Sequence, residues 1–327
     1  MPTDDVLLAA IRNVLPLFFA GVAALATPAQ AADQVHVGKA QGTAWTFLPL
    51  DVAIAEGFFA EQQLDVDYAD LGGDAKVQQA LAAGSIDFGL GSGPGLAFAV
   101  KGGASIGVAA FAGPPRNISA IVLADSPIAT VADLKGKLIA VSSVGSLSDW
   151  LAKQMAIQEG WGQEGIKAVP LGAVETSIAA MRAHQVDAVV LSTEAGFGLE
   201  ERHEGRLLIS MDRYAPHFIT HVVFAQRATV EKDSALIDRF LKGFFAGIAF
   251  MKSRPAETAG LAQRVLHESA SVVGKDQAFL AGMFIDDGRF DPEAVEALKQ
   301  SFVEMRTLPS KPPDEAMFTK RFVPVKP

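Results

Sequence analysis

Two stretches of the chain, one hundred positions apart, decide the fold. Residues 77–92 read VQQALAAGSIDFGLGS, and residues 177–192 read SIAAMRAHQVDAVVLS. In each, helix-forming residues are followed by an apolar residue, an aspartate (Asp87 or Asp187) and an apolar run that stops at a serine. The repeat is longer than a solenoid unit and predicts two similar α/β lobes facing a cleft, where function is expected. We expect both aspartates to tie turns rather than to bind a ligand.

Composition narrows the class of protein. A chain of 327 residues predicts two domains by the rule of about 150 residues each. The net charge of −9 argues against nucleic acid as a partner, because phosphate binding requires a basic surface. The chain has no cysteine, which excludes disulfides, thiolate catalysis and cysteine-ligated metals. We expect neither a cofactor nor a metal ion.

The N-terminal segment has the pattern of a secretory signal. Residues 14–26 form an apolar run of 13, preceded by Arg12 and followed by TPAQA at residues 27–31. The run is too short for a comfortable transmembrane helix, and the small residues after it suit cleavage after Ala31. Asp4 and Asp5 depart from the usual basic start, and a buried helix or a membrane anchor is the alternative. We expect an exported protein whose signal, residues 1–31, is removed.

The periodicity of hydrophobic residues predicts where strands and helices lie along the chain. Strands are predicted at residues 34–40, 64–68 and 86–90 in the first lobe, and at 138–142, 166–169 and 186–191 in the second. The crossing between lobes is placed after a strand at residues 118–124, and the return strand at residues 217–226. The first lobe then comprises residues 32–123 and 222–327, and residues 124–221 form the inserted second lobe. Later helices are predicted at residues 236–251, 255–267, 276–284 and 292–307.

Six segments carry a resemblance to a known family: PLDVAIAEGFF at residues 49–59, GSIDFG at 84–89, DSPI at 125–128, VADLKGK at 131–137, GS at 145–146 and VDA at 186–188. In this order they resemble the periplasmic substrate-binding proteins of ABC importers, in the group that binds nitrate, sulfonates, taurine and thiamine precursors. The resemblance implies two doubly wound α/β lobes joined by a hinge, which is the type II periplasmic binding protein fold. It also implies one small-molecule ligand in the cleft and delivery to a membrane permease. We expect a monomer without enzymatic activity.

A serine-rich segment precedes the first predicted helix of the second lobe. Ser142, Gly145 and Ser146 stand where free amides and hydroxyls suit an anionic group. Ser146 would equally cap the helix, and both interpretations stay open. Gly42 and Thr43 hold the matching place in the first lobe.

Further candidates line the predicted cleft. Trp45 is expected as a cleft wall, with a core position as the alternative. The glycine-rich run 89–95 fails as a dinucleotide fingerprint, because Pro94 stands where glycine is required. It is instead a turn whose amides face the cleft. Asp74 and Glu194 bring carboxylates there, which favours a ligand that also has a cationic or N–H donor group. The candidate ligand-binding residues are Gly42, Thr43, Trp45, Gly73, Asp74, Ser92, Gly93, Ser142, Gly145, Ser146, Thr193, Glu194 and His221.

We therefore expect an extracytoplasmic binding protein for a small organic solute with an acidic group, sulfonate-like or taurine-like by resemblance. The sulfonate-binding relatives have aromatic residues and an acid–proline pair where this chain reads STEA at residues 192–195. A thiamine-type pyrimidine or an aromatic acid is the alternative ligand. An exported enzyme is the alternative class, although no nucleophile elbow occurs in the chain. His217 and His221 lie four positions apart without a third ligand nearby, so no metal site is expected.

Overall fold

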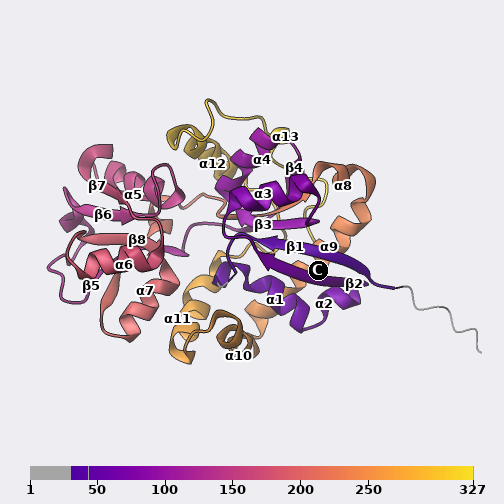
Figure 1. Ribbon diagram of the computed structural model, residues 1–327, viewed down its shortest axis with the longest axis horizontal. Coiled ribbons are helices and arrows are strands. Elements are labelled where there is room, and N and C mark those ends of the chain that lie inside the picture. Colours follow the sequence, from indigo (N-terminus) through magenta and orange to yellow (C-terminus); the bar gives the residue numbers. More distant parts are fainter. Residues whose placement is uncertain (1–30, 43, 327) are drawn as a thin grey trace, which may run out of the picture. The chain divides into compact units, whose positions relative to one another are not determined.

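The computed structural model describes residues 31–42 and 44–326, which contain two five-stranded sheets flanked by helices (Figure 1). The predicted signal segment falls on residues 1–30, outside the described residues, and stays a prediction. None of the helices in the described part combines the length and apolar character needed to cross a bilayer.

The first sheet has the strand order β2-β1-β3-β10-β4. Strand β1 runs parallel to β2 and β3, and β10 runs antiparallel to β3 and β4. Its strands are β1 (Asp33–Lys39), β2 (Leu64–Asp70), β3 (Phe88–Ser92), β4 (Ser105–Ala112) and β10 (His221–Gln226).

The second sheet repeats this plan in the order β7-β6-β8-β5-β9. Strands β6, β7, β8 and β9 take the places of β1, β2, β3 and β4, and β5 takes the place of β10 as the antiparallel strand. Its strands are β5 (Ile118–Leu123), β6 (Leu138–Val141), β7 (Lys167–Pro170), β8 (Ala188–Ser192) and β9 (Gly205–Ser210). The predicted fold class, two similar α/β lobes, is confirmed.

One predicted boundary is wrong. Strand β5 pairs with β8 and β9, so residues 118–123 belong to the second sheet and the first crossing lies at residues 113–117. The return crossing lies between β9 and β10, at residues 211–220. Strand β5 is uniformly apolar apart from Ser119, and such a strand can be buried in either sheet. Only its pairing decides to which lobe it belongs.

Helices cover both sheets. The first lobe contains α1 (Leu48–Ala55), α2 (Phe58–Glu61), α3 (Asp74–Ala83) and α4 (Leu96–Gly102), and the second contains α5 (Leu147–Gln158), α6 (Val174–Arg182) and α7 (Thr193–Glu201). After β10 follow α8 (Arg227–Lys232), α9 (Ser234–Ser253), α10 (Pro255–Leu266), α11 (Ala270–Leu280), α12 (Pro292–Glu304) and α13 (Asp314–Met317). Short 3-10 turns include η1 (Trp45–Phe47), η2 (Gly93–Gly95) and η5 (Met211–Tyr214).

The long helix α9 closes the first lobe through aromatic packing. Phe240 of α9 stacks on Phe88 of β3 at 3.9 Å between ring centroids, and on Phe59 of α2 at 5.2 Å. Fully burying one such side chain contributes about 1.5–3 kcal/mol. Helix α9 thus completes the core of the first lobe.

Asp87 and Asp187 make the same contacts in the two lobes. The Asp87 carboxylate accepts from the backbone N–H of His36 at 2.8 Å, and the Asp187 carboxylate accepts from that of Leu138 at 2.9 Å. In return, each aspartate donates its own N–H to the carbonyl of the same partner residue, at 2.8 Å in both cases. Each residue ties the start of one parallel strand to its neighbour. The interpretation of this repeated aspartate as a structural tie is confirmed.

Replacing Asp87 with alanine should lower the free energy of unfolding by about 1 kcal/mol, the scale of one backbone hydrogen bond. Asp187→Ala should behave alike, and urea denaturation measures both. Asp125→Ala, an exposed change, serves as the control. Unchanged stability combined with lost solute binding would show that Asp87 acts in a site instead.

Candidate functional site

The strands β3 and β8 end in equivalent serines. Ser92 Oγ accepts from the N–H of Gly95 at 3.1 Å, and Ser192 Oγ accepts from the N–H of Ala195 at 3.3 Å. Each serine therefore caps the turn or helix that comes after its strand. This common geometry places the next residues of the two lobes, 93–94 and 193–194, at the carboxyl ends of the parallel strands, where ligands bind in open α/β sheets.

The two crossing segments, residues 113–117 and 211–220, are hydrogen-bonded to the residues that follow these strand ends. The N–H of Gly93 donates to the carbonyl of Thr220 at 2.7 Å, and the N–H of Thr193 donates to that of Asn117 at 2.9 Å. A Cβ on Gly93 would lie 1.8 Å from the Ile219 carbonyl oxygen, so only glycine fits this position. Gly93, a predicted ligand-binding residue, thus has a packing role at the second crossing.

Thr193 also contacts a crossing segment through its side chain. Its fully buried hydroxyl donates to the carbonyl of Arg116 at 2.7 Å and lies 2.8 Å from Ser119 Oγ. The hydrogen bonds of this predicted site residue therefore stay within the protein.

Asp74 binds Ser92 rather than capping its own helix. Its two oxygens accept from the backbone N–H of Ser92 at 2.7 Å and from its hydroxyl at 2.5 Å. Helix α3 begins after Gly73, which has a φ of 140°, and has no side-chain cap, although an aspartate at position 74 would be a common capping residue. Burial raises the pKa of Asp74, and the Ser92 donors oppose this shift. Both oxygens of this carboxylate have donors.

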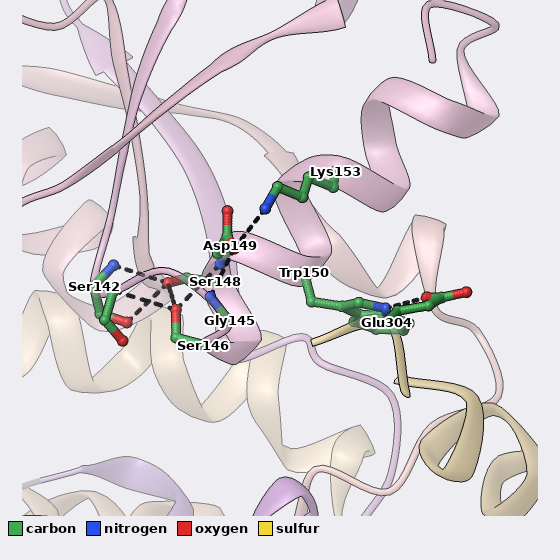
Figure 2. Close-up of polar contacts among 9 residues, drawn as sticks. Ser142, Gly145, Ser146, Ser148, Asp149, Trp150, Lys153 and Glu304 are labelled. Atoms are coloured by element: carbon green, nitrogen blue, oxygen red, sulfur yellow. Dashed lines mark hydrogen bonds and ion pairs between the residues drawn. The ribbon is translucent and has the colours of Figure 1, made fainter. Parts of the chain in front are cut away.

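The start of α5, the predicted anion site, is shown in Figure 2. Ser146 caps the helix, accepting from the N–H of Asp149 at 3.3 Å. The N–H of Gly145 donates to the Asp149 carboxylate at 2.8 Å, and that of Ser142 donates to Ser148 Oγ at 3.0 Å. The amides assigned to an anion from the sequence thus already donate within the chain, and a buried carboxylate stands at this helix start.

Helix α5 is anchored to α12 of the other lobe. Trp150 Nε1 donates to Glu304 at 2.6 Å, as Figure 2 shows, and Lys153 Nζ pairs with Asp149 at 2.8 Å. Gly145 has a φ of +76°, and a Cβ there would lie 2.9 Å from the Met305 carbonyl oxygen. A larger residue at position 145 would therefore disturb packing between the lobes.

The first lobe contributes Trp45 to the lobe contact. Trp45 is 0% exposed, and its indole Nε1 has no hydrogen-bond partner among the described residues. Its backbone N–H donates to Glu194 Oε1 of the second lobe at 3.2 Å. A Cβ on Gly42 would lie 2.7 Å from an Asp70 carboxylate oxygen, and Thr43 lies outside the described residues. Trp45 and Glu194 are the predicted site residues that the fold brings together across the lobes.

Glu194 meets a second carboxylate, Asp276 of α11. Glu194 Oε2 and both oxygens of Asp276 are buried without a hydrogen-bond partner in the described part of the chain. Burial raises the pKa of Glu194 to about 7 and that of Asp276 to about 8, and repulsion from nearby Glu268 adds to both shifts. Glu194 in turn raises the pKa of Asp276. These three acidic residues form the acidic cluster.

A cavity of about 280 Å³ adjoins the acidic cluster and is lined by Glu194, Glu268 and residues of α6 and α7. Helix α11 packs against both α7 and η1. Lys275 of α11 pairs with Glu200 of α7 at 2.8 Å, and Phe279 meets Phe197 edge-on at 5.8 Å. The α7–α11 contact therefore brings the two lobes together at the acidic cluster.

His221, at the start of β10, is 7% exposed and its Nδ1 has no partner among the residues described. The rings of Phe47 and Phe111 lie 5.1 and 5.6 Å from the imidazole. Burial lowers its pKa to about 3, so the ring is neutral at ordinary pH. Over residues 31–42 and 44–326, no group of three histidine or acidic side chains is arranged to hold a metal ion.

Sequence reasoning missed Asp276 and Glu268. The predicted helix began at residue 276, whereas α11 begins at Ala270. With the correct start, Val272, Asp276 and Leu280 fall on one helical face at intervals of four residues. A carboxylate within such an apolar stripe was the available signal.

The raised pKa of Asp276 predicts how stability depends on pH. The carboxyl titrates near pH 4 when unfolded and near 8 when folded, so its contribution to stability falls as pH rises through this window. The neighbouring charged groups, Glu194 and Glu268, are both acidic and raise the pKa of Asp276 further. Asp276→Asn should therefore gain stability relative to wild type from pH 5 to pH 8, measured by urea denaturation. A constant difference across this range would contradict the shifted pKa. His221 titrates in both proteins, so the comparison removes its effect.

Several solved structures share this fold. The aliphatic sulphonate-binding protein SsuA of Escherichia coli has a TM-score of 0.75 and 21% identity, covering 88% of this chain and 92% of that chain. The alkanesulfonate-binding protein SsuA of Xanthomonas axonopodis pv. citri, bound to MOPS, has a TM-score of 0.70 and 20% identity, and the match covers 86% of this chain and 96% of that chain. The desulfurization enzyme DszB has a TM-score of 0.65 and 16% identity, and the match covers 89% of this chain and 97% of that chain. These TM-scores show a common fold, which serves binding proteins and an enzyme.

Sequence comparison identifies the family. No curated protein is significantly similar to the chain in sequence. The NMT1/THI5-like family matches residues 45–258, which is more than half of the 327 residues. This match runs from η1 through the whole second sheet and into α10. The chain therefore belongs to the NMT1/THI5-like family.

Proposed function

We propose that the chain is an extracytoplasmic solute-binding protein, which captures a small organic solute between its lobes and delivers it to the permease of an ABC importer. The observation that carries this proposal is the contact of Trp45 with Glu194 across the lobes. Within the described residues, both side chains keep a buried polar atom without a partner. Buried polar groups are normally hydrogen-bonded, so a solute is the natural partner of these atoms.

The sulfonate-binding neighbours support a solute with an acidic group. The start of α5 is its candidate place, with Ser142 and Ser146 supplying hydroxyls. An acidic group there would have to displace the Asp149 carboxylate from the N–H of Gly145. This observation weakens the sulfonate-like assignment, and a pyrimidine or an aromatic acid is the alternative solute.

An exported enzyme on this fold is the second candidate, favoured by the likeness to DszB. The predicted site residues and Asp276 include two carboxylates, an indole and a neutral imidazole with an unpartnered buried atom in the described part of the chain, which belong to Glu194, Asp276, Trp45 and His221. An enzyme of the acyl-transfer kind requires a nucleophile beside a base. These four side chains include no hydroxyl or thiol nucleophile, so binding is the better supported function.

Solute binding should compact the protein. A ligand shifts an open–closed equilibrium by its differential affinity for the closed form, and hinge closure is the established behaviour of periplasmic binding proteins. We expect native mass spectrometry of the purified mature protein to detect a retained small molecule. Small-angle scattering should give a smaller radius of gyration with this solute than after its removal. The absence of any retained solute, with a radius that no candidate solute changes, would refute the proposed function.

Ser146→Ala separates an anion site from a helix cap. Loss of the cap should lower the free energy of unfolding by about 1 kcal/mol in either case. If an acidic solute binds here, its binding should also weaken by about 1–3 kcal/mol, since a donor to a charged group is lost. Calorimetric titration with a sulfonate and a carboxylate measures this effect.

The matched control for this test is Asp233→Ala, which removes the exposed cap of α9. It should lower stability to a similar extent and leave affinity unchanged. Wild-type affinity for an acidic solute in Ser146→Ala would eliminate the anion site.

A further inference from the structure

Among the described residues, neither Glu194 nor Asp276 of the acidic cluster forms an ion pair. Asp276 and Trp45 are both 0% exposed, and three carboxylate oxygens of Glu194 and Asp276 have no donor in the described part of the chain. A buried carboxylate without a donor is strongly destabilising. The cluster therefore costs stability in the solute-free protein.

The basic residues nearest the cluster are already paired elsewhere. Lys275, next to Asp276 in sequence, binds Glu200 at 2.8 Å. Arg182 and Arg202, which line the adjoining cavity, bind Glu204 at 2.5 and 3.2 Å, and Arg202 also opposes the raised pKa of Glu268. The basic residues beside the cluster thus form ion pairs with Glu200 and Glu204. No basic residue in the described part of the chain is paired with Glu194 or Asp276.

The arrangement of acceptors indicates the shape of the missing cation. Both oxygens of Asp276 are free, and a planar group with two parallel N–H bonds matches such a carboxylate in a bidentate way. Glu194 Oε2 adds a further acceptor from the opposite lobe. The indole N–H of Trp45 is a donor, so it suits an acceptor elsewhere on the same molecule.

We propose that the acidic cluster binds a guanidinium or amidinium group of the solute, with Asp276 as the bidentate acceptor and Glu194 as the acceptor from the second lobe. This inference rests on the proposed function and specifies the class of its solute. It assigns to the solute a planar cationic end.

Benzamidine and benzamide form a matched pair of probes, because they share a shape and differ in charge. Isothermal titration should show benzamidine binding at least ~10-fold more tightly than benzamide, since charge-assisted bonds are about twice as strong as neutral ones. Benzylamine tests a compact ammonium, and benzenesulfonate tests an anion. Tighter binding of benzylamine than of benzamidine would overturn the planar group, and binding of benzamide as tight as that of benzamidine would overturn the cation.

Variants distinguish binding from structure. Asp276→Asn and Glu194→Gln should each weaken benzamidine binding by ~10–100-fold, the loss of a hydrogen bond to a charged group. Both should keep or raise the melting temperature of the solute-free protein, because they remove an unpaired buried charge. The exposed Glu164→Gln is the charge-matched control and should change neither quantity. A lower melting temperature with unchanged affinity would assign these residues a structural role and refute the inference.

The two proposals can fail separately. A retained solute without a cationic nitrogen group, or binding of benzenesulfonate but not of benzamidine, would overturn the inference and leave solute binding intact. The absence of any bound solute by native mass spectrometry and of any response to all four probes would overturn the proposed function as well.

Discussion

Each sheet depends on one antiparallel strand that the chain supplies after leaving the other lobe. Strand β10 lies between β3 and β4, and β5 lies between β8 and β9. A strand with a neighbour on each side satisfies backbone groups on both of its edges, so it cannot be removed without opening the sheet. The chain must therefore cross between the lobes twice, and the crossings pass beside the ends of β3 and β8. This constraint fixes where the candidate site lies.

The repeat makes the two strand ends alike, and the site arises where they differ. Both serines cap the backbone turn after their strand, yet in the first lobe the carboxylate of Asp74 is satisfied by Ser92. In the second lobe Glu194 stands where the first lobe has Pro94, and its carboxylate reaches Trp45 across the lobe contact. The carboxylate of Asp74 is thus fully hydrogen-bonded within the first lobe, whereas Glu194 keeps one oxygen without a partner among the described residues.

On the proposed function, the acidic cluster would couple stability to closure of the lobes. Repulsion between Glu194 and Asp276 opposes the approach of α7 to α11, whereas the pair Lys275–Glu200 and the contact of Phe197 with Phe279 favour it. A cation bound at the cluster would remove the repulsion only when the lobes are together. Its affinity would therefore differ between the open and closed forms, which is the thermodynamic requirement for closure driven by a solute. Unpaired carboxylates retained at a cost in stability are consistent with a functional role.

The sequence alone determined the repeated α/β lobes, most strands and the structural role of Asp87 and Asp187, because hydrophobic period and turn chemistry are local properties. It did not determine the sheet to which β5 belongs, since an apolar strand can be buried in either lobe. Nor did it identify Asp276, whose place on the apolar face depended on the true start of α11. The contact of Trp45 with Glu194 joins residues 149 positions apart. Only the tertiary structure decided such partners, because hydrogen bonds between distant segments leave no periodic trace in the sequence.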